Sequence, residues 1–180
     1  MKQQTNTIIR YPLSATRYTK RAFTLMEMLI VVAILGILAA IILQEFQTQS
    51  ELAKEAAAKD NLRILRNAVE LYAAQHSGIP PGYTNNNPSN TSGGTIAAAQ
   101  LTKPTNASGQ YDQSGSAYRF GPYLKTVPKN PFTWDNRIVT ISTSSPSQAG
   151  SLGWLYNPSK KKVYLNWHGT DKNGIQYINY

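Results

Sequence analysis

The stretch from Phe23 to Leu43 reads FTLMEMLIVVAILGILAAIIL, and only Thr24 and Glu27 in it are polar. A helix rises about 1.5 Å per residue, so this stretch would be about 31 Å long, enough to cross a hydrocarbon core of about 30 Å. All backbone groups of a helix bond internally, as a segment in lipid requires. The stretch therefore predicts a membrane-spanning helix.

Residues 1–22 precede this stretch and contain five basic residues and no acidic one. Positive charge before a span keeps that side in the cytoplasm, so the chain after Leu43 is expected across the membrane. A conventional secretory signal is cut after its apolar region, and no site of that kind follows here. We therefore interpret residues 1–22 as a cytoplasmic leader.

Glu27 is the single acid inside the predicted span. A carboxylate there costs roughly 3 kcal/mol on insertion scales and usually marks a function. One interpretation places it near the interface, where it snorkels or is protonated. The alternative requires a cut between Ala22 and Phe23. The new amine of a neighbouring subunit would then pair with Glu27 in a low dielectric and set the stagger between subunits.

The order of these features, Lys20-Arg21-Ala22 and then the apolar stretch with one acid, resembles the class III signal of type IV pilins and type II secretion pseudopilins. In that family a prepilin peptidase cleaves before the Phe and methylates the new amine, and the Glu at the fifth mature position takes part in assembly. The resemblance implies cleavage between Ala22 and Phe23, N-methylation of Phe23 and an assembly role for Glu27. Family members usually have Gly before the cut, where this chain has Ala22.

The charge balance changes when the leader is set aside. The whole chain has 18 basic and 9 acidic residues, a net charge of +9, and the part after residue 22 has 13 and 9, a net charge of +4. A strongly basic chain can indicate nucleic-acid binding. Because about half of the excess belongs to the leader, we expect no nucleic-acid partner.

From Gln44 the helical pattern continues but becomes amphipathic. Apolar residues recur at spacings of three and four, which indicates one buried face. This stripe consists of Ala58, Leu62, Leu65, Val69 and Tyr72. We predict that the helix continues to about residue 77, where Gly78 and two prolines stop it.

The remainder predicts a loop region and then a β-rich part. Residues 78–116 are rich in Asn, Ser, Thr, Gly and Pro and indicate loop, with a short helix at residues 95–101. Residues 137–141 and 162–166 alternate polar and apolar side chains, and Asn157-Pro158-Ser159 suits a hairpin turn. The predicted fold is α+β and pilin-like: a long N-terminal helix with an apolar transmembrane half, residues 23–43, and an extracytoplasmic domain, residues 44–180, in which the amphipathic half packs on a small antiparallel sheet.

Two later stretches are similar to the major pseudopilins of type II secretion in particular. Residues 121–132, GPYLKTVPKNPF, resemble a Gly-Pro-Tyr-Leu segment followed by a Pro-Lys-Asp/Asn-Pro turn. Residues 153–166 resemble the closing Gly-Trp-x-Tyr hairpin of that family, with Lys160-Lys161-Lys162 where its turn Gly usually stands.

Catalysis has little support in the sequence. The chain has no Cys, which excludes thiol catalysis and cysteine metal sites, and His76 and His168 lack metal-ligand spacing. We expect no enzymatic activity, no catalytic residues and no bound organic cofactor. The resemblance implies calcium in a C-terminal loop, where Asp171 and Asn173 are the candidate oxygen ligands.

The expected function is a structural subunit of a type II secretion pseudopilus, a homo-oligomeric filament of copies stacked head to tail. The resemblance implies a single-pass protein of the bacterial inner membrane with a periplasmic domain, which later joins a periplasmic filament. Its implied partners are lipid, the prepilin peptidase, the inner-membrane assembly platform and other pseudopilins. Three alternatives remain: a type IV pilin of a surface fibre for adhesion, motility or DNA uptake, a single-span protein with a binding domain, and a membrane-anchored enzyme.

Overall fold

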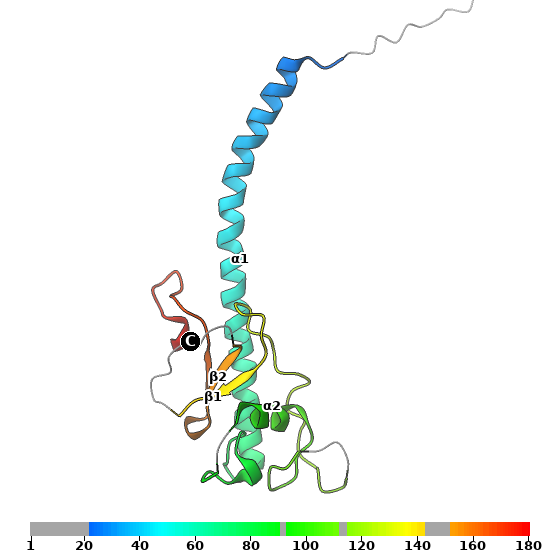
Figure 1. Cartoon of the computed structure of the whole chain (residues 1–180), viewed down its shortest axis with the longest axis vertical. Helices are drawn as coiled ribbons and strands as arrows, with labels where there is room; N and C mark the ends of the chain where they lie inside the picture. Colours follow the sequence, from blue (N-terminus) through cyan, green and yellow to red (C-terminus); the bar gives the residue numbers. More distant parts are fainter. Residues whose placement is uncertain (1–21, 91–92, 112–114, 143–151) are drawn as a thin grey trace, which may run out of the picture. The chain divides into compact units, whose positions relative to one another are not determined.

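The computed structural model describes residues 22–90, 93–111, 115–142 and 152–180 (Figure 1). Its longest element is helix α1, Leu25–Gln75. The chain divides into two compact units, residues 1–45 and 46–180, and α1 contributes to both. Apart from Ala22, the predicted leader lies outside the described residues.

The core of the second unit forms around the predicted apolar stripe of α1. All five stripe residues are buried, each no more than 1% exposed. The same cluster includes Ala97 and Leu101 of helix α2, Gly94–Thr102, and four residues of the sheet, Trp154, Tyr156, Val163 and Leu165. Because side chains alternate across a strand, Leu155 lies on the other face and packs with Tyr164 and Ile178.

The sheet has three strands in the order β1-β2-β3: β1 is Ile138–Thr140, β2 is Trp154–Asn157 and β3 is Lys162–Leu165. Strands β2 and β3 pair antiparallel, whereas β1 and β2 pair parallel, with Ile138 opposite Trp154. The α+β class is confirmed, but the prediction of an antiparallel sheet is wrong for this parallel pair. Parallel strands cannot be joined by a two-residue hairpin turn, so local turn chemistry does not set the direction of β1.

The β2–β3 hairpin closes through a short 3₁₀ helix, Pro158–Lys160. The side chain of Asn157 accepts a hydrogen bond from the backbone N–H of Lys160 at 3.1 Å and so caps this turn. Lys161 then adopts the left-handed conformation, with φ 53° and ψ 28°. A side chain in that conformation costs about 1–2 kcal/mol, whereas Gly adopts it freely. The lysine therefore occupies the position where a turn Gly would be unstrained.

Side-chain amides rather than strands organise the region between α1 and β1. Gln100 on α2 is fully buried; its Oε1 accepts from the Gly82 N–H at 2.6 Å, and its Nε2 donates to the carbonyls of Tyr83 and Gly109 at 3.1 and 2.6 Å. One side chain thus ties two loops to a short helix. A second short 3₁₀ helix, Thr84–Asn86, lies in this region, and a third, Tyr177–Asn179, lies near the C-terminus.

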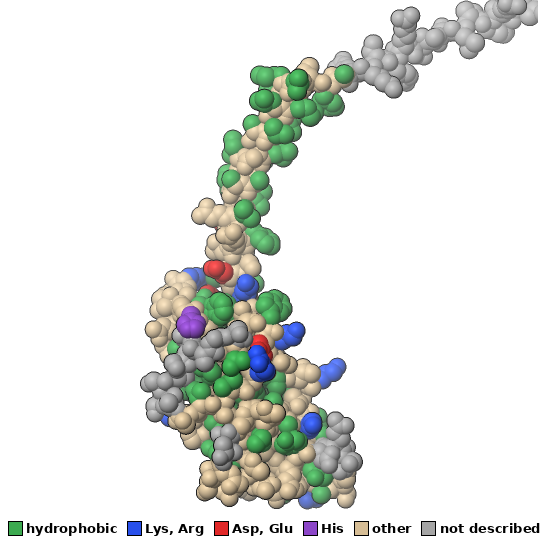
Figure 2. Space-filling view, viewed as in Figure 1, with side chains coloured by type: hydrophobic (Ala, Val, Ile, Leu, Met, Phe, Trp, Pro, Cys, Tyr) green, Lys and Arg blue, Asp and Glu red, His purple; other side chains and the backbone are tan. Residues whose placement is uncertain are grey.

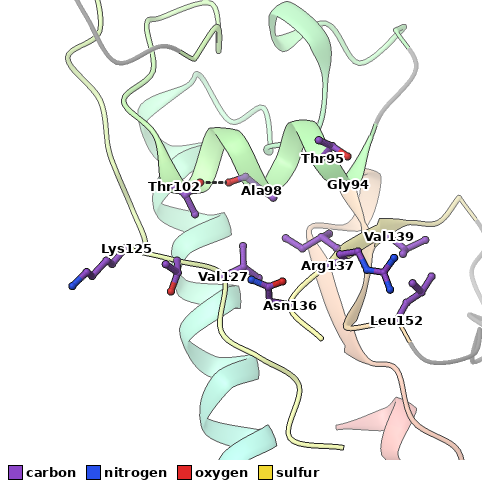
Figure 3. A pocket seen from close by; sticks show the side chains of 12 residues that line it. Gly94, Thr95, Ala98, Thr102, Lys125, Val127, Asn136, Arg137, Val139 and Leu152 are labelled. Atoms are coloured by element: carbon purple, nitrogen blue, oxygen red, sulfur yellow. Dashed lines mark hydrogen bonds between the residues drawn. The ribbon is translucent and has the colours of Figure 1, made fainter. Parts of the chain in front are cut away.

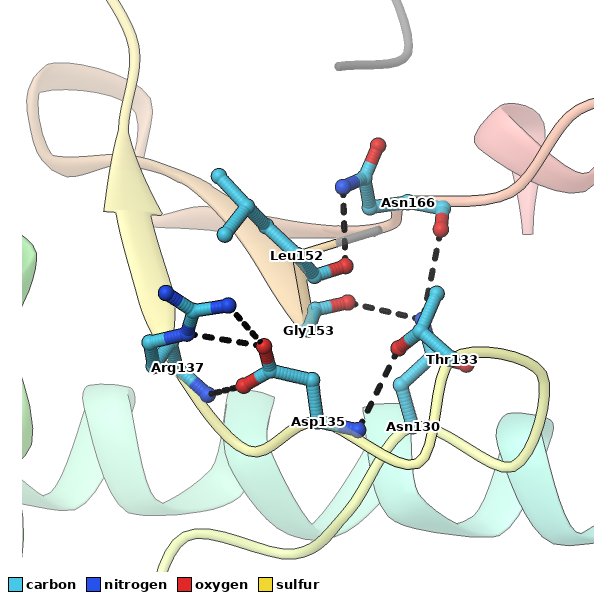
Figure 4. Close-up of polar contacts among 7 residues, drawn as sticks. All are labelled: Asn130, Thr133, Asp135, Arg137, Leu152, Gly153 and Asn166. Atoms are coloured by element: carbon cyan, nitrogen blue, oxygen red, sulfur yellow. Dashed lines mark hydrogen bonds and ion pairs between the residues drawn. The ribbon is translucent and has the colours of Figure 1, made fainter. Parts of the chain in front are cut away.

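Asn130 ties the loop before β1 to both other strands (Figure 4). Its Nδ2 donates to the carbonyls of Gly153 at 2.7 Å and Asn166 at 3.3 Å, and its Oδ1 accepts from the Phe132 N–H at 3.0 Å. Gly153 is needed at this approach, since a Cβ there would lie 2.6 Å from the Arg137 carbonyl oxygen. Fully buried Asn130 therefore fixes where β1 begins beside β2.

The same loop presents a tryptophan to solvent. Trp134 is 71% exposed and has a positive φ of 57°. Its N–H donates to the Asn130 carbonyl at 2.8 Å, and the Asn130 N–H donates to the Asp135 carbonyl at 2.9 Å. These bonds hold the backbone in a conformation that a bulky residue rarely adopts.

We expect Asn130→Ala to lower the free energy of unfolding by about 3 kcal/mol, because it leaves buried backbone groups without partners. Asn136→Ala is the matched control, since Asn136 is exposed in the same loop and should change the value by no more than about 0.5 kcal/mol. Urea unfolding of the full chain in detergent measures both. If both variants lowered the free energy of unfolding by the same small amount, the Asn130 side-chain amide would not be what fixes this loop.

The Lys161→Gly variant should have a free energy of unfolding about 1 kcal/mol higher than the Lys161→Ala variant, because only Gly adopts the left-handed conformation without strain. Both variants remove the exposed 4.0 Å contact between Lys161 Nζ and Glu70 Oε2, so that loss cancels in the comparison. The same unfolding measurement checks it. An alanine variant as stable as the glycine variant would contradict the turn geometry.

Candidate processing and assembly site

The predicted cleavage position lies in an accessible segment. Ala22 and Phe23 are exposed and non-helical, and α1 begins only at Leu25. A peptidase needs a peptide bond outside regular helix, and the bond between Ala22 and Phe23 meets that condition. Cleavage and methylation at this bond stay predictions.

Glu27 forms a reciprocal hydrogen-bonded cap with Thr24 at the start of α1. Glu27 Oε2 accepts from the Thr24 backbone N–H at 2.9 Å and from Thr24 Oγ1 at 3.0 Å, and the Glu27 N–H donates to Thr24 Oγ1 at 3.2 Å. This is a capping box, which satisfies backbone N–H groups that the first helical turn leaves without partners. Both bonds from Thr24 use Oε2, and none of the described residues donates to Oε1.

Thr24 is the residue that the sequence interpretation missed. Thr followed three residues later by Glu before an apolar run is the signature of a capping box. The capping box holds the Glu27 carboxylate through hydrogen bonds from the backbone N–H and the hydroxyl of Thr24. It also places the Glu27 side chain against the first turn rather than extended from it.

The apolar half of α1 has no covering partner within its own unit. The described side chains of residues 22–45 are all exposed, from 92% for Leu25 to 45% for Met28 among the large apolar ones. Figure 2 shows hydrophobic side chains gathered along this segment. Among the described residues, α1 is the one helix long and apolar enough to cross a membrane. Another molecule or a lipid phase must cover this surface.

The two candidate calcium ligands lie in the turn before the C-terminal 3₁₀ helix. Asp171 is 5% exposed, and its Oδ1 accepts from the backbone N–H groups of Asn173 at 2.8 Å and Ile175 at 2.9 Å. Its Oδ2 accepts from the Tyr180 hydroxyl at 2.9 Å. Burial alone would raise the pKa of Asp171, but these hydrogen bonds and the charge of Lys59 together hold that pKa below its usual range.

Asn173 is exposed, so the turn supplies one buried carboxylate whose two oxygens already accept three hydrogen bonds. Ca²⁺ takes about six to eight oxygen ligands. Asp171 and Asn173 by themselves therefore do not fit a calcium site.

A cavity of about 540 Å³ lies between α2 and β1 (Figure 3). Lys125 and Arg137 are the charged residues in its lining, and none of the described residues that line it is His, Cys, Asp or Glu. The Arg137 Nε donates to Asp135 Oδ2 at 2.7 Å, so this cation is already paired. The described lining of this cavity thus offers no acid or base arranged for proton transfer.

The two histidines do not form a site. His76 is buried, stacks on the Tyr72 ring at 3.9 Å and directs Nδ1 to the Tyr72 carbonyl at 2.9 Å, whereas His168 is exposed. Within the described ranges, no three His, Cys, Asp or Glu residues are grouped so that they could hold a metal ion.

Comparison with known proteins identifies the family. The family model described as "Prokaryotic N-terminal methylation motif" matches residues 17–43, which include the predicted cut and Glu27. The type II secretion system core protein G of Vibrio cholerae is 34% identical over 130 residues, 72% of this chain and 74% of that protein. This chain belongs to the type II secretion system core protein G family. The core protein G of Aeromonas hydrophila is 30% identical over 130 residues, 72% of this chain and 76% of that protein.

A third relative extends the match over more of the chain. The core protein G of Pectobacterium carotovorum is 27% identical over 151 residues, 84% of this chain and 86% of that protein. No solved structure matches the chain. These relatives confirm the resemblance to the pseudopilins of type II secretion.

Thr24→Val should speed hydrogen exchange at the Glu27 amide about fivefold, because losing a cap hydroxyl costs about 1 kcal/mol of helix stability. Thr24→Ser retains the hydroxyl and is the matched control, expected to exchange at the original rate. Exchange is measured by NMR on the full chain in detergent micelles. Equal protection in both variants would contradict the cap.

Proposed function

We propose that this protein is a structural subunit of a type II secretion pseudopilus. The observation that carries the proposal is the combination of core protein G relatives with an N-terminal methylation motif on a helix whose apolar half is exposed. A helix of this kind is stable in lipid and also against copies of itself, because both environments cover apolar surface. The subunit leaves the bilayer and joins a filament through the same side chains.

The proposed membrane arrangement follows from charge and length. Lys20 and Arg21 before the apolar half keep the N-terminus in the cytoplasm, and the second unit, residues 46–180, lies in the periplasm. The inner membrane holds the subunit before assembly. A prepilin peptidase cuts before Phe23 on the cytoplasmic side and methylates the new amine.

Glu27 is proposed to register one subunit against the next. Its Oε2 is held by Thr24, which fixes the side chain and leaves Oε1 to accept from the Phe23 amine of a neighbouring subunit. The Glu27 carboxylate and the Phe23 amine attract each other at low dielectric, and the two groups lie on different copies. The contact joins different surfaces of two copies, so it does not close and a filament grows.

A structural role is favoured over an enzymatic one and over a surface fibre. The relatives are named as core proteins of a secretion system, and the described lining of the cavity beside α2 includes two cations but no Asp, Glu or His. The proposed partners are other copies, the inner-membrane assembly platform and other pseudopilins. In this proposal a cytoplasmic ATPase, which is a separate protein, supplies the energy for export.

Mass spectrometry of the protein purified from its host membranes should give a chain that begins at Phe23 and carries one N-terminal methyl group. The unprocessed full chain, expressed in a strain without prepilin peptidase, is the control. A working protein that still begins at Met1 would contradict the proposal.

Glu27→Leu and Glu27→Gln should both lower the yield of filaments at least about tenfold, which corresponds to about 1.4 kcal/mol per contact. Both variants should still insert in the membrane, because they keep every apolar side chain of the span and remove a charge that lipid disfavours. Filament yield is measured by shearing and sedimentation. Normal filaments from Glu27→Gln would show that hydrogen bonding, and not charge, is what Glu27 supplies.

A further inference from the structure

The turn formed by residues 170–175 is closed from inside by Asp171. Two backbone N–H groups, of Asn173 and Ile175, donate to its Oδ1. The Asp171 N–H in turn donates to the Ile175 carbonyl at 2.9 Å. The carboxylate therefore satisfies backbone groups that have no strand partner in this segment.

Tyr180 connects this turn to α1 through three contacts. Its hydroxyl donates to Asp171 Oδ2 at 2.9 Å, its ring lies 4.3 Å from Lys59 Nζ, and its carbonyl oxygen accepts from the Arg66 guanidinium. Arg66 also donates from Nη2 to the Val163 carbonyl at 2.8 Å, so the same cation reaches β3. We call Asp171, Tyr180, Lys59 and Arg66 the Asp171 network.

We propose that the Asp171 network closes the C-terminal turn without calcium, a departure from what the resemblance to the major pseudopilins implies. A divalent cation on Asp171 would have to displace N–H and O–H donors whose hydrogens point at the carboxylate oxygens. The positive charge that a carboxylate in such a turn needs is already supplied by Lys59 on α1. A metal brought to the turn would be repelled by that lysine.

The neighbouring acids do not complete a metal site either. Glu51 and Glu55 line a cavity of about 240 Å³ together with Asp171, but Lys172 lines it as well. The Tyr177 hydroxyl donates to Glu55 Oε1 at 2.8 Å, so this carboxylate also has a partner. Within the described part of the chain, these acids are not grouped closely enough to share a metal ion.

Equilibrium dialysis of the full chain in detergent against radioactive Ca²⁺ tests the proposal directly. We expect less than about 0.1 ion per chain at about 1 mM Ca²⁺, the weak end of affinities for extracellular calcium modules. The melting temperature should be the same, within about 1 °C, in excess chelator and in 1 mM Ca²⁺. Stoichiometric binding, or a melting temperature that rises with Ca²⁺ concentration, would overturn the proposal.

Variants locate the stabilisation in the network. Asp171→Asn and Tyr180→Phe should lower the melting temperature by about 3 °C or more, by equal amounts in chelator and in Ca²⁺. Asp60→Asn is the matched control: Asp60 is an exposed acid on α1 paired with Arg63, and its loss should shift the melting temperature by less than about 1 °C. If Asp171→Asn fails to fold, Tyr180→Phe still tests the Asp171 network, because this variant removes only one hydroxyl. A calcium-dependent stabilisation that disappears in either variant would show that Asp171 is a metal ligand.

Discussion

The structure depends on apolar surface that the chain does not cover itself. Within residues 25–43 every large hydrophobic side chain is exposed, whereas the stripe on the second half of α1 is almost completely buried. Burial of apolar area is the dominant favourable term in folding and association, so the first half requires lipid or other subunits. The same helix therefore has one segment that completes a domain and one that needs an external partner.

The sequence predicted those parts of the fold in which local chemistry sets the structure. The spacing of Ala58 to Tyr72 predicted the buried stripe, and Gly78 with the prolines after it predicted the helix end, which the structure places at Gln75. The hairpin turn at residues 157–159 was predicted from Asn and Pro, and the 3₁₀ helix forms there. These features are read from neighbouring residues alone.

Other features could not be read from neighbouring residues. The position of β1 beside β2 depends on Asn130 and Gly153, which lie 23 residues apart in sequence and meet through one hydrogen bond. Gln100 likewise looks like an ordinary polar residue of a short helix, although it is fully buried and holds two loops. Thr24 differs from these residues, because its capping box is a local signal set inside a stretch whose apolar composition predicts a membrane span.

Buried polar side chains replace cross-links in this domain. The chain has no Cys, and the helices among the described residues of 78–137 are the two short ones, Thr84–Asn86 and Gly94–Thr102. Gln100 and Asn130 each bond to backbone groups of two or more segments, and Asp171 bonds to two backbone N–H groups of its own turn and to the Tyr180 hydroxyl, so these segments are held by side chains. This explains how loops of polar composition remain attached to a small core.

The exposed Trp134 gives the molecule an intrinsic optical reporter. Of the three tryptophans, Trp154 is fully buried and Trp167 is half-buried against the ring of Phe132, whereas Trp134 is 71% exposed on a loop with backbone hydrogen bonds at Asn130. A collisional quencher in the surrounding water reaches Trp134 far more readily than the other two. The part of the fluorescence that the quencher removes therefore decreases when another molecule covers Trp134, and no added label is needed.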